Sequence, residues 1–361
     1  MSSLERYRQV LAQYIDPYLT GDLFSNGIVD CLEEQDSSVT LGLVYPYANN
    51  GSVATLKLEL GELLRSAGAS EVNIDIDFVV QPAVQKSQVD SLSGVKNILA
   101  ISSGKGGVGK STTTVNLALA LVAEGARVGI LDADIYGPSQ GMMLGIKPGT
   151  RPEPLGGDKM LPIEALGLVS MSIAYMVDET TPMVWRGPMA SGAIIQMVNQ
   201  TQWGELDYLL IDMPPGTGDI HLTLSQKVPI SAAVVVTTPQ DIALLDAKRG
   251  IEMFAKVDIP VLGIIENMSV HICSNCGHHE HIFGSGGAQQ LSSQYGCEVL
   301  GSLPLDINIR TMTDSGRPCV VADENGDIAL SYREIARTVG AKLHLLNGQA
   351  NAGPSLSIVE D

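Results

Sequence analysis

The chain has 361 residues, and 45% of them are hydrophobic, which is enough to bury the core of one large domain and a smaller one. Its formal net charge of -18 at pH 7 opposes contact with phosphate backbones and argues against nucleic-acid binding. The N-terminal sequence MSSLERYRQV has no apolar secretion signal, and no apolar run of about eighteen residues predicts a membrane span. Five cysteines, an odd number, do not make a disulfide framework, so we expect a cytoplasmic protein.

Residues 1–80 predict a small α+β domain. LERYRQVLAQYI, residues 4–15, carries apolar side chains at helical spacing. VATLKLELG, residues 53–61, and EVNIDIDFVV, residues 71–80, alternate apolar and polar side chains as half-buried strands do. QPAVQKSQVDSLSG, residues 81–94, is polar with few large side chains and predicts a linker.

Residues 95–346 predict a doubly wound α/β domain with a mostly parallel sheet. Short runs rich in Val, Ile and Leu are typical of strands buried on both faces, and helical segments alternate with them. The runs are NILAISS (97–103), RVGILDAD (127–134), DYLLIDMP (207–214), AAVVVTTP (232–239) and PVLGIIEN (260–267). NGQANAGPSLSIVED, residues 347–361, predicts a polar, acidic tail.

The junction between the first strand and its helix carries a phosphate-binding motif. GKGGVGKS, residues 104–111, fits G-x-x-x-x-G-K-[ST], the pattern of P-loop NTPases. Its glycines let backbone N–H groups curl around the phosphates of ATP, Lys110 reaches the β and γ oxygens, and Ser111 holds Mg²⁺. A chance Gly-rich turn is the alternative, and a dinucleotide site fits worse because no G-x-G-x-x-G opens the helix. The predicted nucleotide-binding residues of this loop are Gly104, Lys105, Gly106, Gly107, Val108, Gly109, Lys110, Ser111 and Thr112.

A second lysine, Lys105, lies at the outer edge of this loop, where it is placed to reach the nucleotide of a facing subunit. KGGVGKST resembles the deviant P-loop of the MinD/ParA class of ATPases. The resemblance implies a homodimer that encloses two ATP molecules, with Lys105 and Lys110 as catalytic residues. Without the complete octapeptide, Lys105 would be interpreted as a solvated surface lysine.

Three polar residues at strand ends fit the same class. In LDADIYGPS, Asp134 resembles the aspartate that orients or deprotonates the attacking water. In YLLIDMPPGTGD, Asp212 resembles the aspartate that binds Mg²⁺ through water, and in IIENMS, Asn267 resembles the asparagine that recognises adenine. Each residue alone would be interpreted as a turn or cap residue.

The segment HICSNCGHHEH, residues 271–281, places Cys273 and Cys276 three positions apart. Such a pair brings two sulfurs to one metal, whereas tetrahedral iron or zinc sites use four protein ligands. Zinc, a redox pair and a structural turn are the alternatives, and the spacing alone does not rank them. Four of the six histidines lie in this segment, and we expect them to be polar loop residues rather than ligands.

The region from about residue 95 to residue 345 resembles the Mrp/ApbC family of iron-sulfur cluster carriers. The likeness rests on KNILAISSGKGGVGKSTTTVNLALAL, LDADIYGPS and ENMSVHICSNCGHHEHIFGSGGA. It implies that Cys273 and Cys276 of two subunits share a 4Fe-4S cluster, which comes from a cluster donor scaffold and passes to apo iron-sulfur proteins. It also implies a slow ATPase whose nucleotide acts as the switch.

Residues 1–80 are similar to an accessory domain of iron-sulfur assembly factors. That domain often carries a cysteine beside a proline, whereas the matching region here reads VYPYANNGSV, so we expect a scaffold or docking role.

The alternative function is a zinc-bridged regulatory or partitioning ATPase of the MinD/ParA kind. A partitioning ATPase needs a membrane-binding amphipathic helix or a basic DNA surface, and the polar C-terminal sequence predicts neither.

Overall fold

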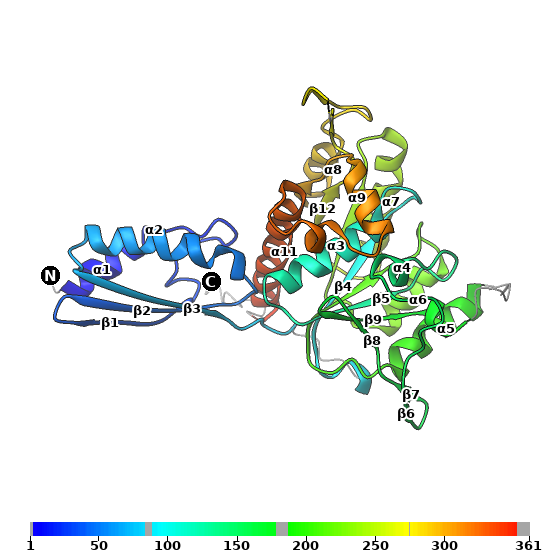
Figure 1. Ribbon diagram of the computed structural model, residues 1–361, viewed down its shortest axis with the longest axis horizontal. Coiled ribbons are helices and arrows are strands. Elements are labelled where there is room, and N and C mark those ends of the chain that lie inside the picture. The colour runs from blue at the N-terminus through cyan, green and yellow to red at the C-terminus, as the bar shows by residue number, and fades with distance from the viewer. Residues whose placement is uncertain (1–2, 84–88, 178–186, 274, 352–361) are drawn as a thin grey trace, which may run out of the picture. The chain divides into compact units, whose positions relative to one another are not determined.

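The computed structural model describes residues 3–83, 89–177, 187–273 and 275–351, and the chain divides into two compact units (Figure 1). The first unit comprises residues 1–84 and 337–361, and the second comprises residues 85–336. The predicted tail lies outside the described residues from residue 352 onward. Within the described ranges, no helix combines the length and the apolar character that a lipid bilayer requires.

The first unit packs helices against a three-stranded sheet. Its elements are α1 (Ser3–Leu11), β1 (Val29–Gln35), β2 (Ser38–Tyr45), η1 (Asn50–Ser52), α2 (Val53–Ser66) and β3 (Glu71–Phe78). The strands lie in the order β1-β2-β3, with β1 antiparallel and β3 parallel to β2. Asp36 and Ser37 take positive φ values of 50° and 67°, as a two-residue hairpin between β1 and β2 requires.

The predicted strand over residues 53–61 is wrong, because these residues open helix α2. Leu56, Leu60 and Leu64 are buried at intervals of four residues, which is the helical period, while Leu58 stays 64% exposed. The alternation of apolar and polar residues in VATLKLELG is therefore coincidental. The strand predicted over residues 71–80 is present as β3.

The last helix, α11 (Asp327–Asn351), differs from the predicted domain bounds. From Arg337 onward it belongs to the first unit, where Ala341 is fully buried in that unit's apolar core and Leu345 packs against it. The Arg337 Nε donates to the hydroxyl of Tyr18 at 2.9 Å. Residues 337–346 were expected in the α/β domain. The spacing of their apolar residues indicates a helix, but it does not show against which of the two cores the helix packs.

The predicted linker, residues 81–94, also contains a packed segment. Residues 84–88 lie outside the described part of the chain, but Asp90–Leu92 form the 3-10 turn η2. Leu92 is 1% exposed, and the Ser91 Oγ donates to the carbonyl oxygen of Val198 at 2.8 Å. The apolar side chain of Leu92 and the hydrogen bond from Ser91 together dock this turn on the second unit.

The second unit is built on an eight-stranded sheet in the order β15-β12-β11-β4-β10-β5-β9-β8, with all pairs parallel except β8 and β9 (Figure 1). The strands are β4 (Val95–Ser102), β5 (Val128–Asp132), β8 (Ile163–Ala165), β9 (Leu168–Ser172), β10 (Leu206–Asp212), β11 (Ala232–Thr237), β12 (Val261–Glu266) and β15 (Glu298–Ser302). The central strands are buried on both faces, as their continuous apolar runs predict.

Helices cover both faces of this sheet, which confirms the doubly wound fold. They are α3 (Lys110–Ala123), α4 (Gln140–Met143), α5 (Gly187–Gln200), α6 (Asp219–Lys227), α7 (Asp241–Lys256), α8 (Gly287–Tyr295), α9 (Ile307–Asp314) and α10 (Cys319–Ala322), with the 3-10 turn η3 (Ile173–Tyr175). Two short hairpins pair β6 (Pro154–Gly156) with β7 (Lys159–Met160) and β13 (His271–Ile272) with β14 (His279–Glu280). The carboxyl ends of the parallel strands meet at one edge, where such folds bind ligands.

Candidate functional site

The loop between β4 and α3 has the geometry of a phosphate-binding loop. Gly107 and Gly109 take φ values of +83° and +84°, which side chains with a Cβ rarely adopt. The backbone N–H of Thr113 donates to the carbonyl oxygen of Gly109 at 2.9 Å, so α3 begins directly at Lys110 with Ser111 and Thr112 in its first turn. The unpaired N–H groups of this first turn are a suitable binding site for phosphate.

Lys110 forms an ion pair with Asp212. The Lys110 Nζ, 6% exposed, lies 2.5 Å from Oδ1 of the fully buried Asp212 and 3.2 Å from Oγ of Ser111. The same carboxylate accepts hydrogen bonds from Thr114 Oγ1 at 3.2 Å and from Gln140 Nε2 at 2.7 Å. Lys110 thus contacts both Ser111 and Asp212, although Asp212 lies 102 positions further along the chain.

Asp132 organises the loop that follows β5. It is paired in register with Asp212 on the neighbouring strand, and it is fully buried. Its carboxylate accepts from the backbone N–H groups of Asp134, Ser139 and Gln140 at 3.1–3.2 Å. Burial, and next the charge of Asp212, raise the pKa of Asp132. Asp132 therefore acts as the structural anchor of the segment that carries Asp134.

Asp134 is half-buried at the start of this loop. Burial raises the pKa of its carboxyl group above the ordinary value, while the positive charge of Lys110 opposes this rise. A general base works best when its pKa lies near the operating pH, so the raised pKa makes this carboxylate a better base at neutral pH. The charges of Lys110 and Asp212 both act on this carboxyl group, so Asp134 lies in the same region as these two residues.

The outer part of the loop contains residues with contrasting surroundings. Lys105 is exposed, and its carbonyl oxygen accepts from Ser103 Oγ at 3.0 Å. Gly104 lies against the backbone of α7, where an added Cβ would meet the carbonyl oxygen of Asp246 at 2.0 Å. An added Cβ at Gly106 would meet only the Cβ of Pro215, at 3.8 Å. Close backbone packing therefore requires the first glycine of the motif but not the second.

Asn267 follows β12 and contacts the P-loop itself. Its Nδ2 donates to the carbonyl oxygen of Val108 at 2.8 Å, and its side chain is 7% exposed. The space where a Cβ of Gly109 would lie is taken by this amide group, at 2.2 Å. Asn267 is thus at the nucleotide end of the sheet, with its amide bound to the loop that would hold the phosphates.

The cysteine pair lies at the tip of the hairpin formed by β13 and β14, within the yellow segment of Figure 1. The backbone N–H of Cys273 donates to the carbonyl oxygen of His278 at 2.9 Å, and that of Gly277 donates to the carbonyl oxygen of Cys273 at 2.8 Å. Cys273 is partly exposed and Cys276 is exposed. This turn brings the two thiols to the same end of the hairpin.

Hydrogen bonds favour the thiolate form of Cys273. Those from the backbone N–H of Asn275 and then of Cys276 lower the pKa of the Cys273 thiol. Within the described ranges, no group of three or more His, Cys, Asp and Glu side chains is arranged to hold a metal ion. The Nδ1 atom of His271 lies 3.2 Å from the carbonyl oxygen of Leu305, and that of His281 lies 2.7 Å from the carbonyl oxygen of Ser269.

Several side chains of this site escaped the sequence analysis. Thr114 and Gln140 bind Asp212, but no spacing rule points to either residue. His221, in α6, is 1% exposed, with its Nε2 3.5 Å from Ser102 Oγ. Burial, together with the charge of Lys110, lowers the pKa of His221 to about 4. Asp132 lies in the motif LDADIYGPS, two residues before Asp134, and this spacing was the feature from which its role could have been inferred.

Comparison with known proteins gives consistent matches. The family model for the ParA group, described as NUBPL iron-transfer P-loop NTPase, matches residues 94–340. The iron-sulfur cluster carrier protein of Pseudomonas fragi is 62% identical over 276 residues, which cover 76% of this chain and 96% of that protein. The protein of the same description from Salmonella typhimurium is 51% identical over 335 residues, covering 92% of this chain and 90% of the relative.

A solved structure agrees with these sequence matches. The nucleotide-binding protein of Archaeoglobus fulgidus, solved in complex with ADP, is 36% identical to this chain. It matches with a TM-score of 0.58 over 68% of this chain and 96% of its own. The predicted resemblance to iron-sulfur carrier ATPases is confirmed by the family match, which covers more than half of the chain. The chain therefore belongs to the family of NUBPL iron-transfer P-loop NTPases.

Proposed function

We propose that this chain is an ATP-dependent iron-sulfur cluster carrier. In this proposal two copies of the chain hold a 4Fe-4S cluster between them and deliver it to apo iron-sulfur proteins. The observation that carries the proposal is the pair of Cys273, partly exposed, and Cys276, exposed, at the tip of a hairpin, on a unit that also contains a P-loop. Relatives over most of this chain are named as iron-sulfur cluster carriers.

The number of ligands supports a shared cluster. A 4Fe-4S cluster takes four thiolates, and the hairpin supplies two. A two-fold axis through a dimer would duplicate the pair and complete the set. The lowered pKa of Cys273 favours the thiolate that binds iron, and exposure of Cys276 suits a cluster that another protein must reach.

The P-loop unit would bind and slowly hydrolyse ATP. Lys110 would contact the phosphates, and Lys105, which is exposed, would reach the nucleotide of the second subunit. Ser111 and Asp212 would hold Mg²⁺, the ion that neutralises charge developing on the transferred phosphoryl group. Asp134, whose pKa is raised, would orient or deprotonate the attacking water.

Two hydrogen bonds and the short stretch of chain between Asn267 and Ser269 connect the P-loop to the cysteine hairpin. The side chain of Asn267 binds the carbonyl oxygen of Val108 in the P-loop. Two residues after Asn267, the carbonyl oxygen of Ser269 lies 2.7 Å from Nδ1 of His281, the residue that follows β14. The hairpin with Cys273 lies between these residues in the chain. A phosphate-induced shift of the P-loop would therefore displace both ends of the hairpin, and we propose that ATP regulates cluster loading or release in this way.

The cluster donor would be a scaffold protein, and the site of action would be the cytoplasm. All five cysteines are free thiols, which is the state that a reducing compartment maintains.

The test is a measurement of iron, acid-labile sulfide and zinc on protein reconstituted without oxygen, together with an absorption spectrum and a solution mass. We expect about four iron and four sulfide per dimer. Cys273→Ala and Cys276→Ala should each lose the cluster, while Cys297→Ala, which changes a buried thiol elsewhere, should keep it. Zinc in place of iron, or a cluster that survives both changes, would favour the zinc-bridged MinD/ParA-like regulator instead.

A further inference from the structure

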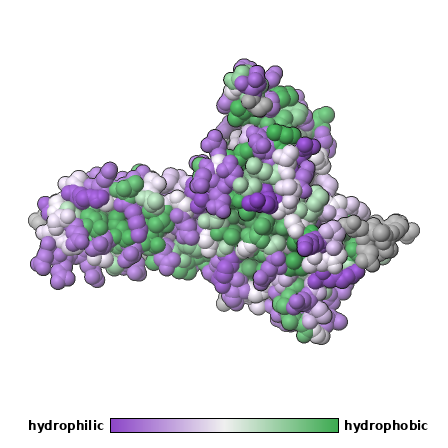
Figure 2. Space-filling model, in the orientation of Figure 1, coloured by the Kyte–Doolittle hydropathy of each residue, from purple (hydrophilic) through white to green (hydrophobic). Residues whose placement is uncertain are grey.

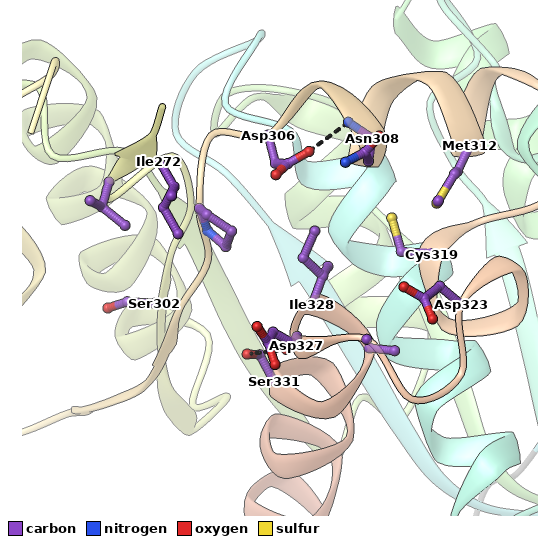
Figure 3. Close-up of a pocket in the computed structure, with 14 residues that line it drawn as sticks. Ile272, Ser302, Asp306, Asn308, Met312, Cys319, Asp323, Asp327, Ile328 and Ser331 are labelled. Atoms are coloured by element: carbon purple, nitrogen blue, oxygen red, sulfur yellow. Dashed lines mark hydrogen bonds between the residues drawn. The ribbon is translucent and has the colours of Figure 1, made fainter. Parts of the chain in front are cut away.

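A cavity of about 340 Å³ lies beside the cysteine hairpin, within the second unit (Figure 3). Its walls come from β13, the end of β15, α9, α10 and the beginning of α11. It includes neither P-loop residues nor Cys273 or Cys276. Ile272, which lines it, directly precedes Cys273 in the chain. A molecule bound in this cavity would therefore lie next to the segment that carries the thiols.

Part of the lining of the cavity is apolar and neutral. Ile272, Met312 and Ile328 line it, and Ile272 is 40% exposed to solvent. Cys319 is 2% exposed, and its sulfur points toward the sulfur of Met312 (Figure 3). Burial, and the charges of Asp306 and Asp323, raise the pKa of Cys319 to about 11, so its side chain stays a neutral thiol. The cavity thus offers a soft, uncharged surface to an apolar side chain.

The rim of the cavity is acidic. Asp306, Asp323 and Asp327 line it, and no lysine or arginine does. Asp306 accepts a hydrogen bond from the backbone N–H of Asn308 at 2.6 Å and so caps α9, whereas Asp323 and Asp327 are exposed. Three carboxylates around an apolar interior are complementary to a ligand that combines cationic and apolar groups. The face of the molecule drawn in Figure 2 carries a mixture of hydrophilic and hydrophobic residues.

We propose that this cavity docks a short basic and apolar segment of the apo-protein that receives the cluster. An apolar side chain of the segment enters between Ile272, Met312 and Ile328, and a lysine or arginine faces Asp323 and Asp327. The identity of the partner rests on the proposed carrier function, whereas the binding chemistry rests on the cavity alone.

The location of the cavity favours a polypeptide partner over a free organic cation. Cluster transfer requires the acceptor to reach Cys273 and Cys276, and a segment anchored one residue from Cys273 would hold the acceptor at that position. The volume of about 340 Å³ accommodates one or two side chains, as an anchor requires, rather than a whole folded surface.

The first experiment titrates full-length protein with two synthetic peptides, one of sequence GLKLKG and one of sequence GLELEG. The signal is the ¹³C-labelled methyl group of Met312, assigned through Met312→Leu. We expect the basic peptide to shift this signal and to bind at least tenfold more tightly than the acidic peptide. Equal binding of the two peptides, or a Met312 signal that does not move, would overturn the proposal.

Matched variants localise the effect. Asp323→Asn combined with Asp327→Asn removes two rim charges with little change in size, and we expect at least tenfold weaker binding of the basic peptide. Glu153→Gln combined with Glu164→Gln removes two exposed charges elsewhere on the same unit and should change binding less than twofold. Equal loss in both variants would show a general effect of net charge and would contradict the proposal.

The second experiment separates this proposal from the carrier function. An apo 4Fe-4S acceptor is fused to GLKLKG, and cluster transfer to it is compared between the wild type and the rim variant, with iron content measured first. We expect equal iron content and at least tenfold slower transfer from the rim variant. If no preparation binds a cluster, the carrier function fails and the peptide titration still decides the cavity. If transfer is equally fast from both, the docking proposal fails alone.

Discussion

The contact between Gly104 and helix α7 predicts a large effect of one added methyl group. In Gly104→Ala the new Cβ would lie 2.0 Å from the carbonyl oxygen and 2.1 Å from the carbonyl carbon of Asp246. Ordinary contacts begin at 3.4 Å, so the two backbones must separate by about 1.4 Å. Neither partner is the flexible end of a side chain. The loop or the helix itself must therefore move.

Two measurable consequences follow from this displacement. Overpacking of this kind costs about 1–3 kcal/mol, so the free energy of unfolding should fall by at least that amount. A phosphate-binding loop displaced by about 1 Å loses its alignment with the phosphates, which predicts about a hundredfold weaker nucleotide binding or slower turnover. Unfolding in urea and titration with a fluorescent ATP analogue measure the two effects.

Gly106→Ala is the matched control. Its added Cβ would lie 3.8 Å from the nearest heavy atom, on Pro215, and its backbone does not take a positive φ. We expect its free energy of unfolding to stay within about 0.5 kcal/mol of the wild type. If Gly104→Ala were as stable and bound the nucleotide as tightly as this control, the close approach of the loop to α7 would be incorrect.

Three further changes test the site. Lys110→Ala should abolish ATP hydrolysis, and it should lower the free energy of unfolding by about 3 kcal/mol because Asp212 stays buried without its cation. Iron binding should persist in this variant. Loss of iron would show that the two sites depend on each other. Asp134→Asn should keep the nucleotide affinity within about twofold of the wild type but slow ATP hydrolysis at least a hundredfold in a phosphate-release assay. Unchanged turnover would exclude Asp134 as the base. His221 stays neutral in the folded chain down to about pH 4, whereas the unfolded chain takes up a proton near pH 6.5, so acidification between these values favours unfolding. Between about pH 7.5 and about pH 5, the free energy of unfolding of the wild type, measured in urea titrations, should therefore fall by about 2 kcal/mol more than that of His221→Gln. His278→Gln, which changes an exposed histidine, is the control. Equal losses in the wild type and His221→Gln would contradict the buried neutral state of His221.

The fold of the second unit was predictable because its strands and loops obey local rules. The apolar runs around Leu99 and Leu210 are buried on both faces, and the glycines of the P-loop take the backbone angles that the motif requires. The spacing of Cys273 and Cys276 singled out the pair, whereas the hairpin that carries it was not predicted. The roles proposed for these residues remain predictions until the experiments above are made.

The features that escaped prediction depend on long-range packing. Residues 53–61 alternate like a strand, but the burial of Leu56 and Leu60 decided for a helix. Gln140 reaches Asp212 across 72 positions, and no local pattern encodes such a contact. The cavity beside the hairpin is likewise built from segments between Val270 and Ser331 that only the fold brings together.

The path of α11 determines when each unit can be completed during synthesis. Residues 85–336 are contiguous, so the ribosome releases everything that the second unit needs before the last part of the helix appears. Residues 1–84 precede the second unit in the chain, yet the core of the first unit lacks Ala341 and Leu345 until residues 85–336 have been made. The first unit is therefore completed only after the second unit has been synthesised, and a fragment of residues 1–83 would expose the apolar surface that α11 normally covers.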